Sequence, residues 1–451
     1  MPRPLLAFVA SVAFLAYALG YFTSFKNLPP NSVIVSAHDT AVDLWLHWKN
    51  DLGLAPTRLL VPAARPERDL RRTSDPARAA PGYRFIAALT PKRDSLAGAL
   101  LLDQSGRELH YWPIDYGKLA PGGLSPSNVY LHGTMPLPDG SLIVVFDNGD
   151  LMARLGPCGE ALWVNRGQFH HALGLSDDGT AWAWEYQERT TADGEKVNKE
   201  MIVQVELASG RRLRQISLED DIVDGQALHG RFAILSQESA EKVAYCCDHF
   251  HPNDVKPLPP ALAPAFPMFR PGDLLISLRS LNMIAVIDPG TAQVKWSQIG
   301  PWHRQHDPDF MPDGTISVLN NNMGLGASQI VVVDPKTGGV RIAFDGATRD
   351  NFYTWRRGRH QWLPNGNIMI AETEKGRAIE VDPTGEIVWQ YNNVFDEARN
   401  GVVSEALGLP SDFFAEGALS CAPSKADPAP TAAVPGRKRV LATELSPSPT
   451  Q

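Results

Sequence analysis

The chain carries six copies of one motif, in which an apolar strand leads through a short turn rich in Asp and Gly into a second strand. The turns begin at Asp103, Gly156, Glu206, Asp288, Asp334 and Asp382, and the second strands reach Trp112, Trp163, Ile216, Trp296, Phe344 and Trp389. Successive turns start roughly 46 to 53 residues apart, except for one gap of 82 (288 − 206). Short strands repeated at this period predict an all-β, six-bladed β-propeller. Such a fold brings one strand of every blade to a central channel, where residues distant in sequence can meet.

Four histidines stand at similar places in this repeat. His132, His171 and His306 each lie seven residues before an Asp-Gly turn, and His360 lies five residues before Asn365-Gly366. Strand side chains alternate between two faces, so odd offsets of seven and five place these imidazoles on the same face. A single histidine on a strand is usually structural. Four in register with the repeat favour a functional cluster in the channel.

Composition and charge narrow the class of protein. The chain has 451 residues, of which 43% are hydrophobic and 20% charged, as expected for a large globular protein rather than a disordered one. The formal net charge of −8 argues against a nucleic-acid partner.

The N-terminal region predicts a targeting segment. Residues 5–22 carry no charge and are mostly apolar, which suits a membrane-spanning signal anchor or a cleaved signal peptide over residues 1–24. The length of the run favours the uncleaved anchor, and either alternative implies export. Residues 25–80 follow as a juxtamembrane helix, placed at 39–52, and a linker.

The propeller is expected over residues 81–396. Its blades are placed at 83–116, 130–166, 169–218, 249–298, 303–346 and 358–392. For residues 397–451 we expect a short helix at 397–416 and a Pro/Ala-rich tail. Within that tail, residues 440–443 either supply a strand that closes the ring or belong to a disordered end.

The four cysteines permit a disulfide in an exported protein. Cys158 could bridge to Cys246 or Cys247, and the sequence does not decide the pairing. The spacing of the cysteines is not that of a zinc site.

Blade four carries a polar cluster of its own. His251 and Asn253 lie at its start, and Arg279 ends the apolar run 274–278. A buried guanidinium needs an anion, and its planar fork suits a sulfate, phosphate or carboxylate. A structural salt bridge is the alternative for Arg279.

These motifs together resemble the bacterial arylsulfotransferase family, the PAPS-independent sulfotransferases of the periplasm. The resemblance rests on His251-Pro252-Asn253, on the Ser-x-Arg-x-x-Asn of 277–282, on the 288–296 turn, on Gln305-His306-Asp307 and on His170-His171. It implies a six-bladed propeller that moves a sulfuryl group between phenols through a sulfohistidine, without a cofactor or metal. It implies that His306 is the nucleophile and that His171, His251, Asn253 and Arg279 hold the sulfuryl group. His171 is our choice of acid/base, and His132 and His360 are expected to line the channel.

The expected partners are an aryl sulfate donor, a phenolic acceptor and the inner membrane, with the body on the periplasmic face. A different hypothesis is a non-catalytic envelope propeller that binds an anionic ligand or acts as a scaffold. A third is a metal site lined by the histidines, for which the sequence has no spacing signature.

Overall fold

The computed structural model describes residues 3–25, 37, 41, 57–63, 71–73, 75–90, 93, 95–190, 196–225, 250–348 and 352–421. The chain divides into two compact units, residues 1–58 with 429–451, and residues 59–428. The first unit contains the helix α1 (Arg3–Phe25). The search for a membrane span found none: no helix among the described residues is sufficiently long and apolar. The predicted membrane anchor is therefore not supported, and the helix expected at 39–52 falls almost wholly outside the described residues.

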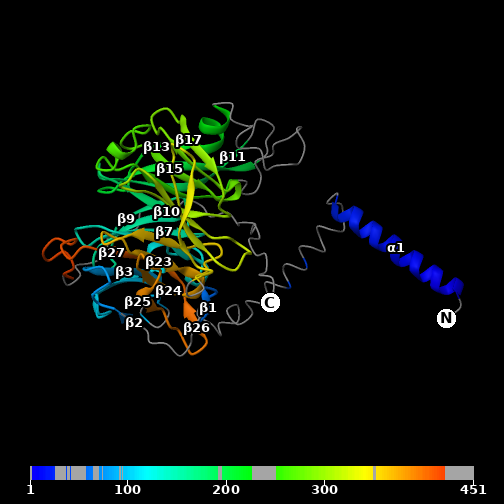
Figure 1. The fold of residues 1–451 in the computed structure, drawn as a ribbon, viewed down its shortest axis with the longest axis horizontal. Helices are drawn as coiled ribbons and strands as arrows, with labels where there is room; N and C mark the ends of the chain where they lie inside the picture. Colours follow the sequence, from blue (N-terminus) through cyan, green and yellow to red (C-terminus); the bar gives the residue numbers. More distant parts are fainter. Residues whose placement is uncertain are drawn as a thin grey trace. The chain divides into compact units, whose positions relative to one another are not determined.

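The second unit is a β-propeller of six antiparallel sheets (Figure 1). Blade one is β27 (Val403–Leu409), β3 (Tyr83–Leu89), β4 (Ala97–Leu102) and β5 (Glu108–Ile114). Blade two is β6 (Tyr130–Pro136), β7 (Leu142–Asp147), β8 (Leu151–Leu155) and β9 (Ala161–Arg166). Blade three is β10 (Gln168–Ser176), β11 (Thr180–Thr190), β12 (Lys196–Glu206) and β13 (Arg212–Ser217).

The other three sheets continue in chain order. Blade four is β14 (Pro252–Pro257), β15 (Leu274–Leu278), β16 (Met283–Ile287) and β17 (Val294–Ile299). Blade five is β18 (His306–Phe310), β19 (Ile316–Asn320), β20 (Gln329–Val333) and β21 (Val340–Asp345). Blade six is β22 (Arg359–Trp362), β23 (Ile368–Glu372), β24 (Arg377–Val381) and β25 (Ile387–Asn392), with β2 (Arg71–Thr73) at its outer edge. The predicted all-β, six-bladed fold is confirmed.

Short elements lie between the blades and in the connections within them. β1 (Leu60–Pro62) pairs with β26 (Arg399–Gly401) in a small two-stranded sheet. The helical turns are α3 (Tyr116–Leu119), η1 (Pro126–Asn128), the π-helical η2 (Leu218–Asp224), η3 (Ala263–Ala265), η4 (Arg279–Leu281) and η5 (Thr373–Lys375).

The ring closes differently from the prediction. Residues 397–416 do not form a helix; they contain β26 and β27, and β27 pairs along its length with β3. Val403 and Ala406 of β27 are fully buried, so pairing with blade one outweighs the helix propensity of the Glu-Ala-Leu run. The propeller thus extends past residue 396, and one sheet contains strands from both of its ends (Figure 1). Residues 440–443 lie outside the described residues.

The apolar core lies between the blades. Each pair of adjacent blades shares one cluster of buried side chains, and Trp112, Trp184 and Trp389 are among the largest fully buried ones. Trp112 and Trp389 are two of the aromatics that end the repeated motif. The motif is therefore repeated because each blade must cover its neighbour.

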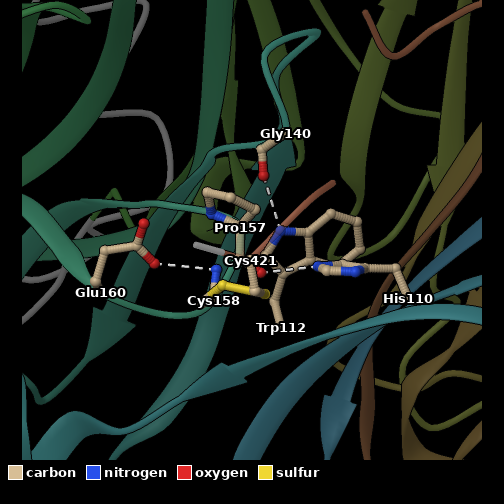
Figure 2. The surroundings of a disulfide bond; sticks show 7 residues. All are labelled: His110, Trp112, Gly140, Pro157, Cys158, Glu160 and Cys421. Carbon is tan, nitrogen blue, oxygen red and sulfur yellow. Dashed lines mark hydrogen bonds between the residues drawn. A yellow bond between two sulfur atoms is a disulfide. The ribbon is translucent and has the colours of Figure 1, made fainter. Parts of the chain in front are cut away.

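A disulfide fastens the end of the propeller to blade two. Cys158, in the turn between β8 and β9, bonds to Cys421, and the two Cα atoms are 5.5 Å apart. Figure 2 shows the surrounding contacts: the Cys158 N–H donates to Glu160, and the Trp112 indole N–H donates to the Gly140 carbonyl. The sequence left the partner of Cys158 open, with Cys246 and Cys247 as the possibilities, and the structure pairs it with Cys421 instead. The correct partner follows β27, a strand that sequence reasoning did not place in the ring.

Candidate active site

The first strands of the six sheets contact one another in a closed ring, in the order β6, β10, β14, β18, β22 and β27. Their side chains line the channel predicted from the repeat. Five of these strands contain an irregularity in their pairing, at His132, at His171-Ala172, at Asn253, at Asp307-Pro308 and at Ser404. Bulges re-aim side chains and are common beside active sites. The bulges here fall on three of the seven predicted site residues.

Four imidazoles gather at this place. The ring centroids of His132 and His171 are 4.7 Å apart, and those of His171 and His251 are 4.8 Å apart. Charges on His132 and His251 also act on His306, and all four residues are at most 8% exposed. His171 and His251 have φ angles of 57° and 45°, a left-handed conformation rare for residues with a side chain. Such backbone strain is typical of functional sites.

His306 is held in one tautomer with one nitrogen open. Its Nδ1 atom lies 2.7 Å from Oδ1 of Asn321, while its buried Nε2 atom has no hydrogen-bond partner among the described residues. Since the amide oxygen can only accept, Nδ1 carries the proton and Nε2 carries a lone pair. Burial, followed by the charge of Arg279, lowers the pKa of His306 well below its usual value. The residue is therefore a neutral imidazole with an available nucleophilic nitrogen.

His132 has a carboxylate behind it. Its Nδ1 atom lies 2.7 Å from Oδ2 of Asp147, at the end of β7, and Oδ1 of Asp147 accepts the backbone N–H of His171. Burial alone would raise the pKa of Asp147, but His132 and these hydrogen bonds lower it to about 2. Burial lowers the pKa of His132, and Asp147 opposes that shift. An imidazole supported in this way can take up and release a proton through Nε2.

His171 is supported through a second histidine. Its Nδ1 atom lies 2.7 Å from Nδ1 of His170, whose Nε2 atom lies 3.1 Å from Oε2 of Glu200. If Glu200 accepts from His170, then His171 donates through Nδ1 and its Nε2 atom also carries a lone pair. Burial and the neighbouring His132 and His251 lower the pKa of His171 well below its usual value.

Arg279 and Asn253 border the same cluster. Arg279 is the first residue of η4, its backbone N–H donates to the His251 carbonyl, and its charge acts on His306. The Asn253 amide donates to the carbonyl of Gln305, and Gln305 in turn binds Ser277, Leu278 and Met283 of blade four. These bonds fix the start of β18, and with it His306, against blade four.

His360 lies in a different cluster. Its backbone N–H and Nδ1 both approach Oδ2 of Asp307, and its Nε2 atom is 2.8 Å from Oγ of Ser317. Arg359 donates to Asp254 and Asp307, and Lys256 pairs with Asp307 and Asp309. Among the described residues, the ring contacts join His132, His171 and His251 with one another but do not include His360, which shares the channel strands without joining the imidazole cluster.

Two sets of side chains have ligand atoms near enough for a metal. They are His132, Asp147 and His171, and Asp307, Asp309 and His360, with the atoms of each set within 4.8 Å of one another. In the first set both oxygens of Asp147 already accept hydrogen bonds, and in the second Lys256 neutralises the carboxylates. Both arrangements are satisfied by the protein itself.

Sequence reasoning missed the groups behind the imidazoles. Asp147, Glu200 and Tyr130 were not predicted, although Asp147 follows a wholly apolar run, 142–146, where a carboxylate is conspicuous. Asn321 lies in the stretch Asn320–Asn322, which does stand out in sequence.

Comparison with known proteins decides the family. The family model described as Arylsulfotransferase (ASST) matches residues 133–394, more than half of the chain. The chain belongs to the arylsulfotransferase family. The matched region of this arylsulfotransferase-family protein contains His171, His251, Asn253, Arg279 and His306. No curated protein matches the chain.

Several solved structures are similar in part. A protein of unknown function from Bacteroides caccae is 13% identical, with a TM-score of 0.43 over 72% of this chain and 99% of its own. A functionally unknown protein from Desulfotomaculum acetoxidans is 11% identical, with a TM-score of 0.40 over 71% and 98%. A catalytically inactive virginiamycin B lyase from Staphylococcus aureus with quinupristin is 11% identical, with a TM-score of 0.36 over 61% and 74%. At these values the likenesses carry no conclusion about chemistry.

Proposed function

We propose that this protein is a PAPS-independent aryl sulfotransferase that moves a sulfuryl group from an aryl sulfate to a phenol through His306. The observation that carries the proposal is the open Nε2 atom of a buried, neutral His306 beside Arg279. A neutral imidazole nitrogen is a competent nucleophile, and a covalent intermediate divides one difficult displacement into two.

In the first half-reaction the Nε2 lone pair forms a bond to sulfur while the bond from sulfur to the aryl oxygen breaks. The leaving phenolate takes a proton from a neighbouring imidazolium. The resulting sulfo-imidazolium keeps its proton on Nδ1, which still donates to the Asn321 oxygen. In the second half-reaction the acceptor phenol gives its proton to the same imidazole, its oxygen attacks sulfur, and the bond to Nε2 breaks. The chemistry needs no cofactor.

Stabilisation of the transferred group falls to the cationic and polar side chains around His306. Sulfuryl transfer resembles phosphoryl transfer in that charge spreads over the equatorial oxygens. Arg279, His251 and Asn253 come from blade four, next to the blade that carries His306. We assign them to the sulfuryl oxygens.

Either His171 or His132 can serve as the acid/base. The sequence favoured His171. The carboxylate in direct contact with Nδ1 of His132 supports His132 as the stronger base, since an adjacent anion stabilises the imidazolium.

Intact-mass analysis with 4-nitrophenyl sulfate tests the proposal. We expect a sulfuryl adduct that maps to His306 and is absent in His306→Ala. His303→Ala is the matched control, because His303 is exposed on the segment just before β18. Adduct formation or nitrophenol release by a folded His306→Ala variant would refute the mechanism.

The same purified protein also tests two other functions. Anion binding without an adduct would favour a non-catalytic envelope propeller. Stoichiometric metal would favour a site at His132, Asp147 and His171.

Location in the periplasm is also a proposal. The Cys158–Cys421 bond supports an oxidising compartment, because disulfides persist there and are rare in the cytosol.

A further inference from the structure

An apolar cavity of about 180 Å³ lies between blades one and two. Its walls come from β3, β5, β6 and β7 and from the segment before β27. They include Leu89, Leu96, Ile114, Tyr130, Phe146 and Val402. An apolar cavity of roughly 150 Å³ holds a benzene molecule, so this one has room for a short alkyl chain or one ring.

Tyr130 belongs both to this cavity and to the surroundings of the imidazole cluster. It lines the cavity, and its ring centroid is 4.9 Å from that of His132. Both residues lie at the start of β6, and the contact between their rings is direct evidence that they adjoin, since the strand pairing is irregular at His132. A ligand whose oxygen meets His132 thus has the cavity within reach beyond Tyr130.

The Tyr130 ring is fixed at the boundary between the cavity and the imidazole cluster. Its hydroxyl oxygen is buried and has no hydrogen-bond partner among the described residues. The guanidinium of Arg357 lies 4.2 Å from the ring centroid and holds the ring in place.

We infer that the cavity binds the substituent opposite the reacting oxygen of the aryl group, so that the substrates are para-alkylated or bicyclic phenols and their sulfates. The inference rests on the proposed function and names its substrate class. Donor and acceptor pass through the same sulfohistidine, so their rings occupy one position in turn. The cavity therefore selects both.

A series of donors tests this inference on the full chain. For phenyl, 4-methylphenyl, 4-ethylphenyl and 4-propylphenyl sulfate, kcat/KM is expected to rise about fourfold for each added carbon, the gain for burying one methylene. Ala97 lines the cavity and is only half-buried, so Ala97→Phe fills it from the edge. In that variant kcat/KM should no longer rise along the donor series, while the kcat/KM for phenyl sulfate stays within about threefold of its value in the unchanged protein.

Ala161→Phe is the matched control, since Ala161 is an exposed residue of β9 away from the cavity. It should keep the rising series. Leu96→Trp, at a second half-buried wall residue, repeats the test should Ala97→Phe not fold. A flat series in the unchanged protein, or a rising one in both filled variants, would overturn the inference.

Failure of the proposed function gives a different result. If no aryl sulfate is turned over, calorimetry with 4-propylphenol still tests the cavity. Binding to the unchanged protein and to Ala161→Phe, with at least a tenfold loss in Ala97→Phe, would support it. Equal binding to all three, or binding to none, would refute it.

Discussion

The Nδ1 atom of His306 and the Oδ1 atom of Asn321 are 2.7 Å apart, and the contacts of the Asn321 amide nitrogen show which of the two atoms donates. The Asn321 amide nitrogen donates to the carbonyls of Thr354 and Arg357, which fixes the amide orientation. His306 must therefore donate from Nδ1. The neutral Asn321 oxygen sets the tautomer and raises the pKa of His306 only through its hydrogen bond, whereas the carboxylate behind His132 raises the pKa of that imidazole through its charge as well.

The first prediction concerns the pH dependence of the nucleophile. Arg279→Met removes a positive charge that lowers the pKa of His306, so this pKa rises. Because only the neutral imidazole attacks, the acid limb of sulfuryl-adduct formation should move to higher pH. Single-turnover rates between pH 4.5 and 7.5 measure the shift, and the rate at the plateau should fall roughly 10²–10³-fold.

Arg279→Lys is the control for this experiment. It keeps the charge and should keep the acid limb, although it loses the bidentate geometry and part of the rate. Identical acid limbs in the Met and Lys variants would show that Arg279 does not act on His306 through its charge.

The second prediction concerns the disulfide. The bond between Cys158 and Cys421 closes a long loop that contains β9 to β27, since the two cysteines are separated by 263 residues. Loss of the bond in Cys421→Ser should cost about 2–5 kcal/mol of unfolding free energy. The double variant with Cys158→Ser and Cys421→Ser should lose no more unfolding free energy than either single variant. A reductant should not lower the unfolding free energy of the double variant further. Additive losses would mean that the two sulfurs act separately.

The third prediction concerns Glu405, which directly follows the bulge residue Ser404 on β27. Burial raises the pKa of Glu405 to about 8, against the opposing charge of Arg359. The folded protein therefore holds a proton that the unfolded chain loses above pH 4.5. The sign follows: the contribution of Glu405 to the free energy of unfolding should fall as the pH rises from about 4.5 to 8, by up to about 1.4 kcal/mol per pH unit, and the net curve should fall above about pH 6.5.

Urea unfolding across this range measures the slope. Glu405→Gln keeps the oxygen that accepts the Ala406 N–H, removes the titration, and should flatten the curve and stabilise the protein at pH 8. Asp147 and Asp307 have lowered pKa values, so their contributions change only below about pH 4. The lowered pKa values of His132, His171 and His306 make the free energy of unfolding rise with pH up to about 6.5, so the slopes are compared between pH 6.5 and 8. A slope unchanged in Glu405→Gln would assign it to another group, with Glu219, whose pKa burial raises to about 7, as the first to test.

The sequence predicted the blades because each one repeats a local pattern. An apolar strand, an Asp-Gly turn and a closing aromatic are read within about 15 residues, and they predicted the strands of blades two to six within a few residues of their positions. Ring closure has no local pattern. β27 forms because blade one offers an edge to be paired, and its Ser-Glu-Ala-Leu stretch indicates a helix when read alone.

The same distinction applies to the candidate site. His132 and His171 come together as the repeat implies, and His251, from the separate polar cluster of blade four, joins them. His360, at an offset of five instead of seven, enters a network of carboxylates. The partners of the imidazoles lie on neighbouring strands, so their roles depend on cross-strand register. Sequence spacing gives the face of a strand but does not give that register.

The fourth prediction identifies the acid/base residue. In Asp147→Asn the amide can keep the His171 N–H on its oxygen, and its nitrogen then donates to Nδ1 of His132. That leaves His132 as a neutral imidazole with its proton on Nε2 and removes the anion that stabilises the imidazolium, so the leaving phenolate loses its proton donor. Adduct formation should slow by about 10²–10⁴-fold with phenyl sulfate, whose leaving group needs a proton, and much less with 4-nitrophenyl sulfate, whose leaving group does not.

Glu200→Gln is the matched change for His171, because Glu200 supports that imidazole through His170. If His132 is the acid/base, only Asp147→Asn should separate the two donors. If His171 is, only Glu200→Gln should do so. A loss of the same size for both donors would mean that the carboxylate only positions the cluster, since a merely structural defect does not depend on the pKa of the leaving group.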